Sequence, residues 1–309
     1  MPHVRPIAGI YDRVGAAWRE PVNAPNAAFS RISLDGVELS ALGRKVRWHE
    51  QTLSLANALF TRDTVFTAGS KNLTFSSTRF LSATRPNLGV VSLSFSCDKA
   101  ANITLESGID ANIWDLNGPH LLQLTSTLHD AVLLVEGLTS ENARHVSVAE
   151  MLSFECAPDE SHEVSGNRNL RVLRLRAEAG QTYTFHKYPA VYTEHDRVKG
   201  PLGRAAVETV RQASIQGYGA CLAEHDAEWS DRWRRCDVEI KSDDEAQHAL
   251  RYSIFQLLMV APVKGSANSI PARALSGQVY KGAIFWDTEM FMLPFFLHTY
   301  PEKAVELMR

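Results

Sequence analysis

Residues 29–39 read FSRISLDGVEL, and this stretch is the clearest local indication of the fold class. Apolar side chains alternate with polar ones on both sides of Asp35-Gly36, as they do in strands that bury one face. Gly36 accepts the positive φ that a two-residue hairpin turn requires, and Asp-Gly is a strong signal for such a turn. The stretch therefore predicts an antiparallel β-hairpin.

Similar short strands fill the chain from about residue 28 to residue 193. They are rich in β-branched and aromatic residues, and turn residues rather than helical periods separate them. The further strands that we expect cover residues 46–55, 73–81, 90–97, 102–106, 121–125, 131–138, 145–154, 170–176 and 182–187. Their number and spacing predict a β-sandwich and argue against a parallel βαβ fold with a nucleotide-binding crevice.

The pattern changes after Lys199-Gly-Pro201, where apolar residues recur every three to four positions, as they do in helices. We expect a helical linker over residues 196–236, interrupted at Gly217-Tyr-Gly219. The aromatic side chains expected to pack this linker against the following segment are Trp229, Trp233 and Phe255.

Two capping boxes predict where later helices begin. Residues 237–240 have a strand-like pattern, and Ser242 with Glu245 three positions later then indicates a helix start. Thr299 and Glu302 form the second box, close to the last residue.

The composition excludes several classes of function. The 309 residues are 45% hydrophobic and 22% charged, as expected for a globular protein of about two domains. Lys and Arg number 32 against 35 Asp and Glu, so a formal charge of -3 provides no field that would attract nucleic acid. The longest apolar stretch, residues 255–263, is far shorter than the ~18 residues that span a bilayer. We expect no nucleic-acid or membrane partner and, without a secretory signal, a cytoplasmic location.

Cysteine and histidine spacing predicts no metal site. No two cysteines stand in a chelating pair, so we expect free thiols at Cys97, Cys156, Cys221 and Cys236. No histidine has a second one at chelating spacing with a carboxylate helper, which favours surface or core positions for all of them.

The densest set of candidate functional residues lies in residues 269–296, SIPARALSGQVYKGAIFWDTEMFMLPFF. An aromatic ring can cover the apolar faces of a sugar while a carboxylate accepts hydrogen bonds from its hydroxyls, so Trp286 and Asp287 are candidates for sugar binding. The structural alternative makes Trp286 a core residue and Asp287 a helix N-cap. Other polar side chains of the same loop are Arg273, Ser276, Gln278, Tyr280 and Lys281. Of these, Arg273, Tyr280 and Lys281 are candidates for either substrate contact or loop structure.

This segment closely resembles glycoside hydrolase family 65, and the resemblance extends over essentially the whole chain. The motifs that carry it in the second half are Asp243–Gln247, Arg251–Gln256, Ile270–Arg273, Leu275–Gln278, Tyr280–Gly282 and FWDTE at residues 285–289. In the first half they are Asn23–Asn26, residues 53–62 and Ser107–Asp110. The family contains inverting phosphorylases of maltose, trehalose, kojibiose, nigerose and related α-glucosides, with a minority of hydrolases. Many members have His where this chain has Ala283.

The resemblance implies a β-supersandwich, a helical linker and an (α/α)6 barrel whose mouth holds the active site. We expect the sandwich at residues 1–195, the linker at 196–236 and an incomplete barrel start at 237–309. Trp286 and Asp287 would hold the donor glucose. The general-acid glutamate and the phosphate-binding residues are expected downstream of Arg309, so no catalytic residue is assigned in this chain.

The implied reaction converts an α-linked glucose disaccharide and inorganic phosphate into β-glucose 1-phosphate and a free sugar, with inversion. Phosphate is a co-substrate, no cofactor is expected, and the family resemblance suggests a homodimer. Two alternatives remain open, an α-glucoside hydrolase of the same family and a non-catalytic sugar-binding or dimerisation remnant. Because the last short helix cannot close a helical domain that begins near residue 237, we expect a truncated chain that is inactive alone.

Overall fold

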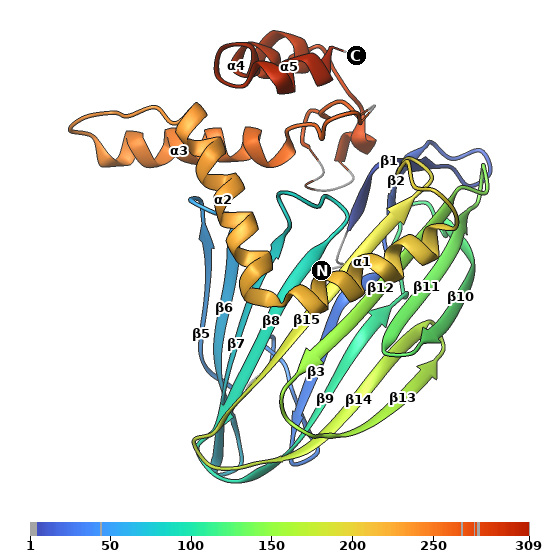
Figure 1. Cartoon of the computed structure of the whole chain (residues 1–309), viewed down its shortest axis with the longest axis vertical. Coiled ribbons are helices and arrows are strands. Elements are labelled where there is room, and N and C mark those ends of the chain that lie inside the picture. Colours follow the sequence, from blue (N-terminus) through green and yellow to red (C-terminus); the bar gives the residue numbers. More distant parts are fainter. Residues whose placement is uncertain (1–4, 44, 267, 275, 277–278, 309) are drawn as a thin grey trace.

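The computed structural model describes residues 5–43, 45–266, 268–274, 276 and 279–308. Two antiparallel sheets and a separate two-stranded ribbon form a β domain, and helices follow it (Figure 1). The larger sheet has the strand order β10 (Leu121–His129), β11 (Val132–Thr139), β12 (His145–Phe154), β15 (Thr182–Thr193), β8 (Gly89–Cys97), β7 (Lys71–Leu81), β6 (Leu59–Ala68) and β5 (Val46–Ser54). The smaller sheet has the order β13 (Asp159–Ser165), β14 (Arg168–Ala177), β9 (Ala101–Asp110), β3 (Asn26–Leu34) and β4 (Val37–Leu39). The ribbon pairs β1 (Pro6–Asp12) with β2 (Glu20–Asn23).

The helical elements begin after the last strand. They are α1 (Leu202–Gln216), α2 (Tyr218–Cys236), α3 (Asp244–Val260), the 3₁₀ turn η1 (Val279–Gly282), the π-helical turn η2 (Thr288–Met292), α4 (Leu293–Thr299) and α5 (Pro301–Leu307). The expected β-sandwich followed by helices is confirmed.

The hairpin predicted from residues 29–39 is confirmed as β3 and β4. Leu34 pairs with Val37, and the two turn residues Asp35 and Gly36 have φ values of 47° and 78°. Both turn residues are left-handed, as a type I′ turn requires. The strands β1, β2, β6 and β13 were not predicted from the sequence pattern. β13 is an edge strand with nearly every side chain exposed, so no alternating pattern marks it.

The main core lies between the two sheets, where inward-facing apolar side chains of both interdigitate. Phe95 and Phe185 stack at 5.8 Å between ring centroids, and both are almost fully buried, as is Leu105 of the smaller sheet. Burying one such aromatic side chain stabilises the fold by about 1.5–3 kcal/mol. This packing makes the β domain a firm base for the loops at its ends.

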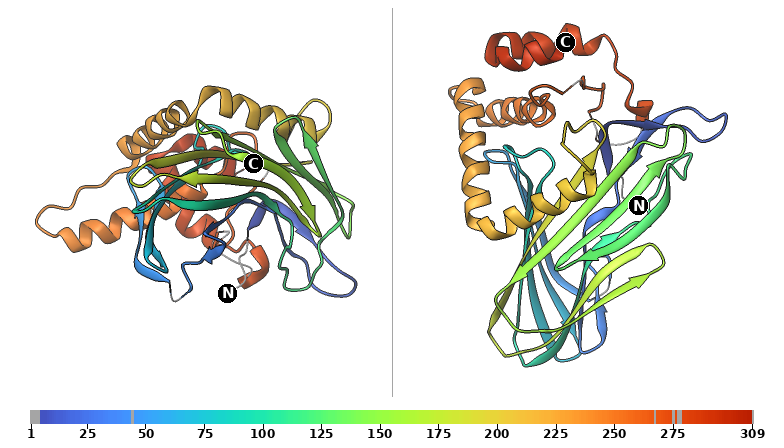
Figure 2. Two further views of the ribbon diagram at one scale, coloured as in Figure 1. Left: turned by 90° about the horizontal axis from the view of Figure 1, so that it is seen from below. Right: turned by 45° about the vertical axis from the view of Figure 1, so that its right-hand side comes forward.

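The first helix, α1, covers part of the outer face of the larger sheet, and α2 then extends away from the sheet (Figure 2). The apolar face of α1 packs on β12 and β15, where Ala206 and Val210 meet Tyr188. Figure 2 shows α1 lying along the β domain and α2 leading away from it toward α3. Gly217 separates α1 from α2 because its φ of 85° and ψ of 160° depart from the helical conformation and are readily adopted only by glycine.

The predicted aromatic packing between α2 and α3 is confirmed. Trp229 stacks on Phe255 at 5.3 Å between ring centroids, and both side chains are buried. The indole N–H of Trp233 donates to the carbonyl of Leu55, so α2 also holds the β5–β6 turn. These contacts fix α3 relative to the β domain.

The predicted strand at residues 237–240 is wrong. The side chain of Gln247 accepts from the Ile240 amide and donates to the Val238 carbonyl, which ties this segment to α3 rather than to a neighbouring strand. Asp237 accepts two hydrogen bonds from Arg251 of α3, at 3.0 and 2.7 Å. Helix contacts therefore replace strand pairing.

Both predicted capping boxes are also wrong in detail. The N-cap of α3 is Asp243, whose carboxylate accepts from the Ala246 amide at 2.9 Å, while Ser242 is left-handed with a φ of 68°. The Thr299 hydroxyl donates back to the Phe295 carbonyl, and α5 begins after Tyr300 without a side-chain cap. In each case the helix starts one residue later than expected.

Three of the four cysteines are buried and Cys156 is half-buried, all as free thiols. Among the described helices, none is long and apolar enough to cross a membrane.

Candidate functional site

The candidate sugar-binding residues lie in a loop that we call the aromatic loop, residues 279–287, between α3 and η2. Its end is fixed by Thr288, whose buried hydroxyl donates to the Ile270 carbonyl at 2.8 Å. Across the loop, the Ala272 amide donates to the Ala283 carbonyl at 3.4 Å. The segment that carries Arg273 therefore lies beside the aromatic loop.

Trp286 and Asp287 stand at the open end of this loop. Trp286 is 65% exposed, and its ring packs against Phe291 at 5.8 Å between centroids. Among the described residues, Trp286 is therefore not part of an apolar core. Asp287 is half-buried at the N-cap position of η2, but its side chain makes no capping hydrogen bond. An exposed indole beside a carboxylate that makes no helix-capping hydrogen bond is an arrangement suited to a polyhydroxylated ligand.

The other candidates have different surroundings. Tyr280 is exposed and meets Phe285 edge to face at 6.0 Å between centroids. The ammonium of Lys281 lies 3.8 Å from the centre of the Trp18 ring, which is a cation–π contact with the β1–β2 hairpin. Arg273 is exposed, and its carbonyl accepts from Ser276. Gln278 lies outside the described residues.

The backbone of the aromatic loop has an unusual conformation. Tyr280, Lys281 and Gly282 have φ values of 61°, 55° and 66°, a left-handed run that costs energy at each residue other than glycine. The Tyr11 hydroxyl donates to the Gly282 carbonyl at 2.9 Å. Burial raises the pKa of Tyr11, so this hydroxyl remains a donor at neutral pH. The ribbon thus supports a strained segment immediately before Trp286.

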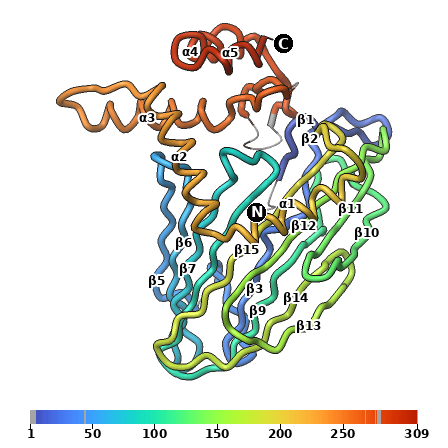
Figure 3. The backbone as a smooth tube through the Cα atoms, viewed as in Figure 1, coloured from blue at the N-terminus to red at the C-terminus, as the bar shows by residue number. Residues whose placement is uncertain are grey.

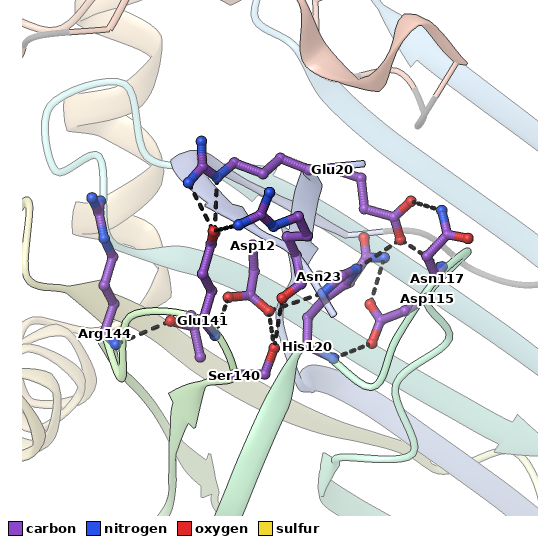
Figure 4. Close-up of polar contacts among 12 residues, drawn as sticks. Asp12, Glu20, Asn23, Asp115, Asn117, His120, Ser140, Glu141 and Arg144 are labelled. Carbon is purple, nitrogen blue, oxygen red and sulfur yellow. Dashed lines mark hydrogen bonds and ion pairs between the residues drawn. The ribbon is translucent and has the colours of Figure 1, made fainter. Parts of the chain in front are cut away.

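A buried ionic cluster, which we call the His120 cluster, holds this ribbon to the β domain (Figure 4). His120 lies between Asp12 of β1 and Glu20 of β2, with its two ring nitrogens 3.0 and 2.8 Å from their carboxylate oxygens. All three side chains are fully buried. Since each carboxylate accepts a hydrogen bond, both nitrogens carry protons and the ring is a cation.

Neighbouring groups satisfy the remaining carboxylate oxygens. Ser140 donates its hydroxyl to Asp12 at 2.5 Å, and the Glu141 amide donates to the same carboxylate at 2.8 Å. Asn117 donates its amide and its side chain to Glu20, at 2.9 and 3.1 Å. Five residues from two strands and two loops therefore surround the His120 ring, directly or through its two carboxylate partners.

The pKa values agree with this charge assignment. Burial works against the charge of His120, but its hydrogen bonds to Glu20 and Asp12 outweigh burial and raise its pKa. Burial likewise opposes ionisation of the two acids, but hydrogen bonds lower the pKa of both. For Asp12 the donors are Ser140, the Glu141 amide and His120. For Glu20 they are Asn117 and His120. All three shifts therefore favour the charged forms, one cation between two anions.

Sequence reasoning missed this cluster and the role of the ribbon. His120 was expected at a surface or core position, and the structure places it in the core with two ionic partners. Asp12 and Glu20 lie about a hundred residues before it, and no local pattern joins them. Within the described ranges, no group of three or more His, Cys, Asp or Glu side chains is arranged to hold a metal ion.

Comparison with known proteins identifies two family matches. The model of "Glycosyl hydrolase family 65, N-terminal domain" matches residues 5–232, and that of "Glycosyl hydrolase family 65 central catalytic domain" matches residues 251–309. A nigerose phosphorylase of Lachnoclostridium phytofermentans is 37% identical, over 98% of this chain and 43% of its own length. A 1,2-alpha-glucosylglycerol phosphorylase of Bacillus selenitireducens is 28% identical, over 98% of this chain and 39% of its own length.

A solved structure gives the same fold. This protein from the human microbiome, provisionally described as a kojibiose phosphorylase, superposes with a TM-score of 0.89 at 20% identity, over 98% of this chain and 42% of its own. The chain spans about two-fifths of the length of the relatives that it matches.

Proposed function

The chain belongs to glycosyl hydrolase family 65, and from this premise we propose that the protein carrying it is an inverting α-glucoside phosphorylase. The observation that carries the proposal is the match of both family domains together with relatives that are named phosphorylases. The described residues would supply the β domain, the α2–α3 connection and the aromatic loop of the catalytic domain. Inorganic phosphate is the second substrate.

In the proposed reaction, phosphate attacks the anomeric carbon of the donor glucose from the face opposite the glycosidic bond. The bond from that carbon to the acceptor oxygen breaks, a bond to a phosphate oxygen forms, and a carboxylic acid gives its proton to the departing oxygen. The product is β-glucose 1-phosphate. Because phosphate is already an anion, the reaction needs no second carboxylate to activate water, unlike inverting hydrolysis. We expect the acid downstream of Arg309.

Trp286 and Asp287 would bind the donor glucose. The exposed indole is available to cover one face of the sugar ring, and the Asp287 carboxylate, which makes no helix-capping bond, is available to the sugar hydroxyls. Their contribution is to hold the anomeric carbon in line with phosphate rather than to transfer a proton.

Nigerose is the first donor to test, since the nigerose phosphorylase is 37% identical to this chain whereas a kojibiose phosphorylase is 27% identical. The donor linkage would then be an α-1,3 bond between two glucose units. Kojibiose, trehalose and maltose are the comparison substrates, because relatives with these names also match the chain.

The experiment uses the protein encoded by the complete reading frame. It measures glucose 1-phosphate formed from each disaccharide with and without phosphate, and proton NMR identifies the anomer. The Asp287→Ala variant should lose at least about 100-fold in kcat/KM, as expected for lost hydrogen bonds to a charged group. Its thermal midpoint should be unchanged, because no helix cap is lost. The control is Asp159→Ala, at an exposed position of the edge strand β13.

Other outcomes separate the alternatives. Glucose release that does not depend on phosphate would identify a hydrolase of the same family. Absence of turnover on all four disaccharides, in a protein that still binds glucose, would identify a non-catalytic sugar-binding protein. Light scattering of the same preparation tests the homodimer.

A further inference from the structure

The ribbon and the aromatic loop fit closely together, although about 270 residues separate them in the sequence. Gly282 is buried against the ribbon, and a Cβ atom at this position would lie 2.7 Å from the Tyr11 ring and 2.9 Å from Pro21. The Tyr11 hydroxyl donates to the Gly282 carbonyl at 2.9 Å. One residue earlier, Lys281 places its ammonium over the Trp18 ring.

These contacts occur where the loop needs support. Tyr280 and Lys281 are both left-handed, a conformation that side-chain-bearing residues rarely adopt without external contacts. Trp286 follows Gly282 by four residues. The direction in which Trp286 and Asp287 project therefore depends on how the preceding segment is held.

The ribbon is itself firmly attached to the β domain. Asp12 and Glu20, at the two ends of its hairpin turn, both bind buried His120. Arg13 and Arg19 inside that turn both pair with Glu141, at 2.9 and 2.7 Å. In Figure 3 the ribbon lies at the end of the β domain that faces the helices. A rigid support therefore reaches from the sandwich to the aromatic loop.

We propose that Tyr11 and Trp18 of the amino-terminal ribbon are positioning residues for the aromatic loop, which they hold in the conformation that binds donor sugar. The reaction-related part of this inference rests on the proposed function. In this role both residues act through the loop rather than on the sugar. Tyr11 fixes the carbonyl of Gly282, and Trp18 orients the Lys281 side chain, so the β domain contributes to substrate binding through the loop.

The test uses the protein encoded by the complete reading frame, with the variants Tyr11→Phe and Trp18→Leu. Tyr192→Phe is the first control, because Tyr192 is also half-buried and its hydroxyl shares one hydrogen bond with Thr209, in a part of the β domain that does not contact the loop. Trp48→Leu is the second, because Trp48 is 48% exposed and Trp18 is 47% exposed. Hydrogen exchange of residues 279–287 and steady-state kinetics are measured for all four variants.

We expect Tyr11→Phe and Trp18→Leu to speed exchange in residues 279–287 and to raise the KM for the disaccharide about three- to tenfold, with kcat changed less than twofold. The controls should change neither. Unaltered exchange, or faster exchange with unaltered KM, would overturn the proposal. If the wild-type protein makes no glucose 1-phosphate, the proposed function is wrong. The hydrogen-exchange comparison would still show whether the ribbon stabilises the conformation of the aromatic loop.

Discussion

Replacement of His120 by Leu should destabilise the protein strongly, because it removes the cation from a fully buried cluster. Asp12 and Glu20 would keep their hydrogen bonds from Ser140, Glu141 and Asn117 but lose their only buried counter-charge among the contacts described. Removal of one partner from a buried ion pair costs about 3–5 kcal/mol. At about 2–4 °C per kcal/mol for a domain of this size, the thermal midpoint should fall by roughly 6–20 °C.

The assay is thermal and urea unfolding followed by circular dichroism. His145→Leu is the matched control, because His145 is 36% exposed and lies 3.5 Å from Glu136, a pair expected to contribute less than ~1 kcal/mol. The triple variant with His120→Leu, Asp12→Asn and Glu20→Gln should recover part of the loss if unpaired charge is the cause. A His120→Leu protein as stable as the His145→Leu control would refute the assignment of a buried cation.

The pH dependence has a defined sign. The folded protein raises the pKa of His120, so its stabilisation is complete below the ordinary value of about 6.5 and is lost as the pH rises through the raised value. Asp12 and Glu20 have lowered pKa values, so their stabilisation is complete above about 4.5 and is lost on acidification. The stability difference between wild type and His120→Leu should therefore be largest between about pH 5 and 6.

Three further predictions concern other parts of the molecule. Gly282→Ala should disturb the aromatic loop by about 1–3 kcal/mol, because Ala disfavours a φ of 66° and its Cβ would meet the ribbon; faster hydrogen exchange at residues 279–287 would show this. Phe255→Ala should cost about 3–5 kcal/mol in urea unfolding, since this fully buried ring joins α2 to α3, and a loss below ~1 kcal/mol would contradict that role. Burial lowers the pKa of Lys187 to about 8, so the unfolded state binds the extra proton above that pH and the contribution of Lys187 to stability should rise from there toward about pH 10. The stability of the wild type relative to Lys187→Met should therefore rise over this range, and a difference that does not change with pH would contradict the assignment.

Local signals explain which parts of the fold could be predicted. Asp35-Gly36 specifies a hairpin because the turn conformation depends on those two residues alone. The apolar period after residue 201 likewise predicts α1, because one face of a helix must be buried. β13 could not be predicted in this way, because neither of its faces is buried and its residues show no alternating pattern of apolar side chains.

Competition between nearby groups explains the errors. The start of α3 could be placed only to within a residue, since Ser242 and Asp243 are both good caps and the left-handed backbone at Ser242 leaves the cap to Asp243. Residues 237–240 have a strand pattern, but Arg251 and Gln247 of α3 supply their partners. Propensity is a weak signal that such contacts override.

The sequence by itself determined the family. It also indicated Trp286 and Asp287 as candidate sugar-binding residues, because the aromatic ring and the carboxylate belong to neighbouring residues of the chain. Only the tertiary structure decided that Trp286 is exposed, that His120 is a buried cation and that Tyr11 supports Gly282. The physical reason is the sequence distance of the partners. The energy of a buried ion pair or of a strained loop depends on groups a hundred or more residues away, and these meet only after the sheets have formed.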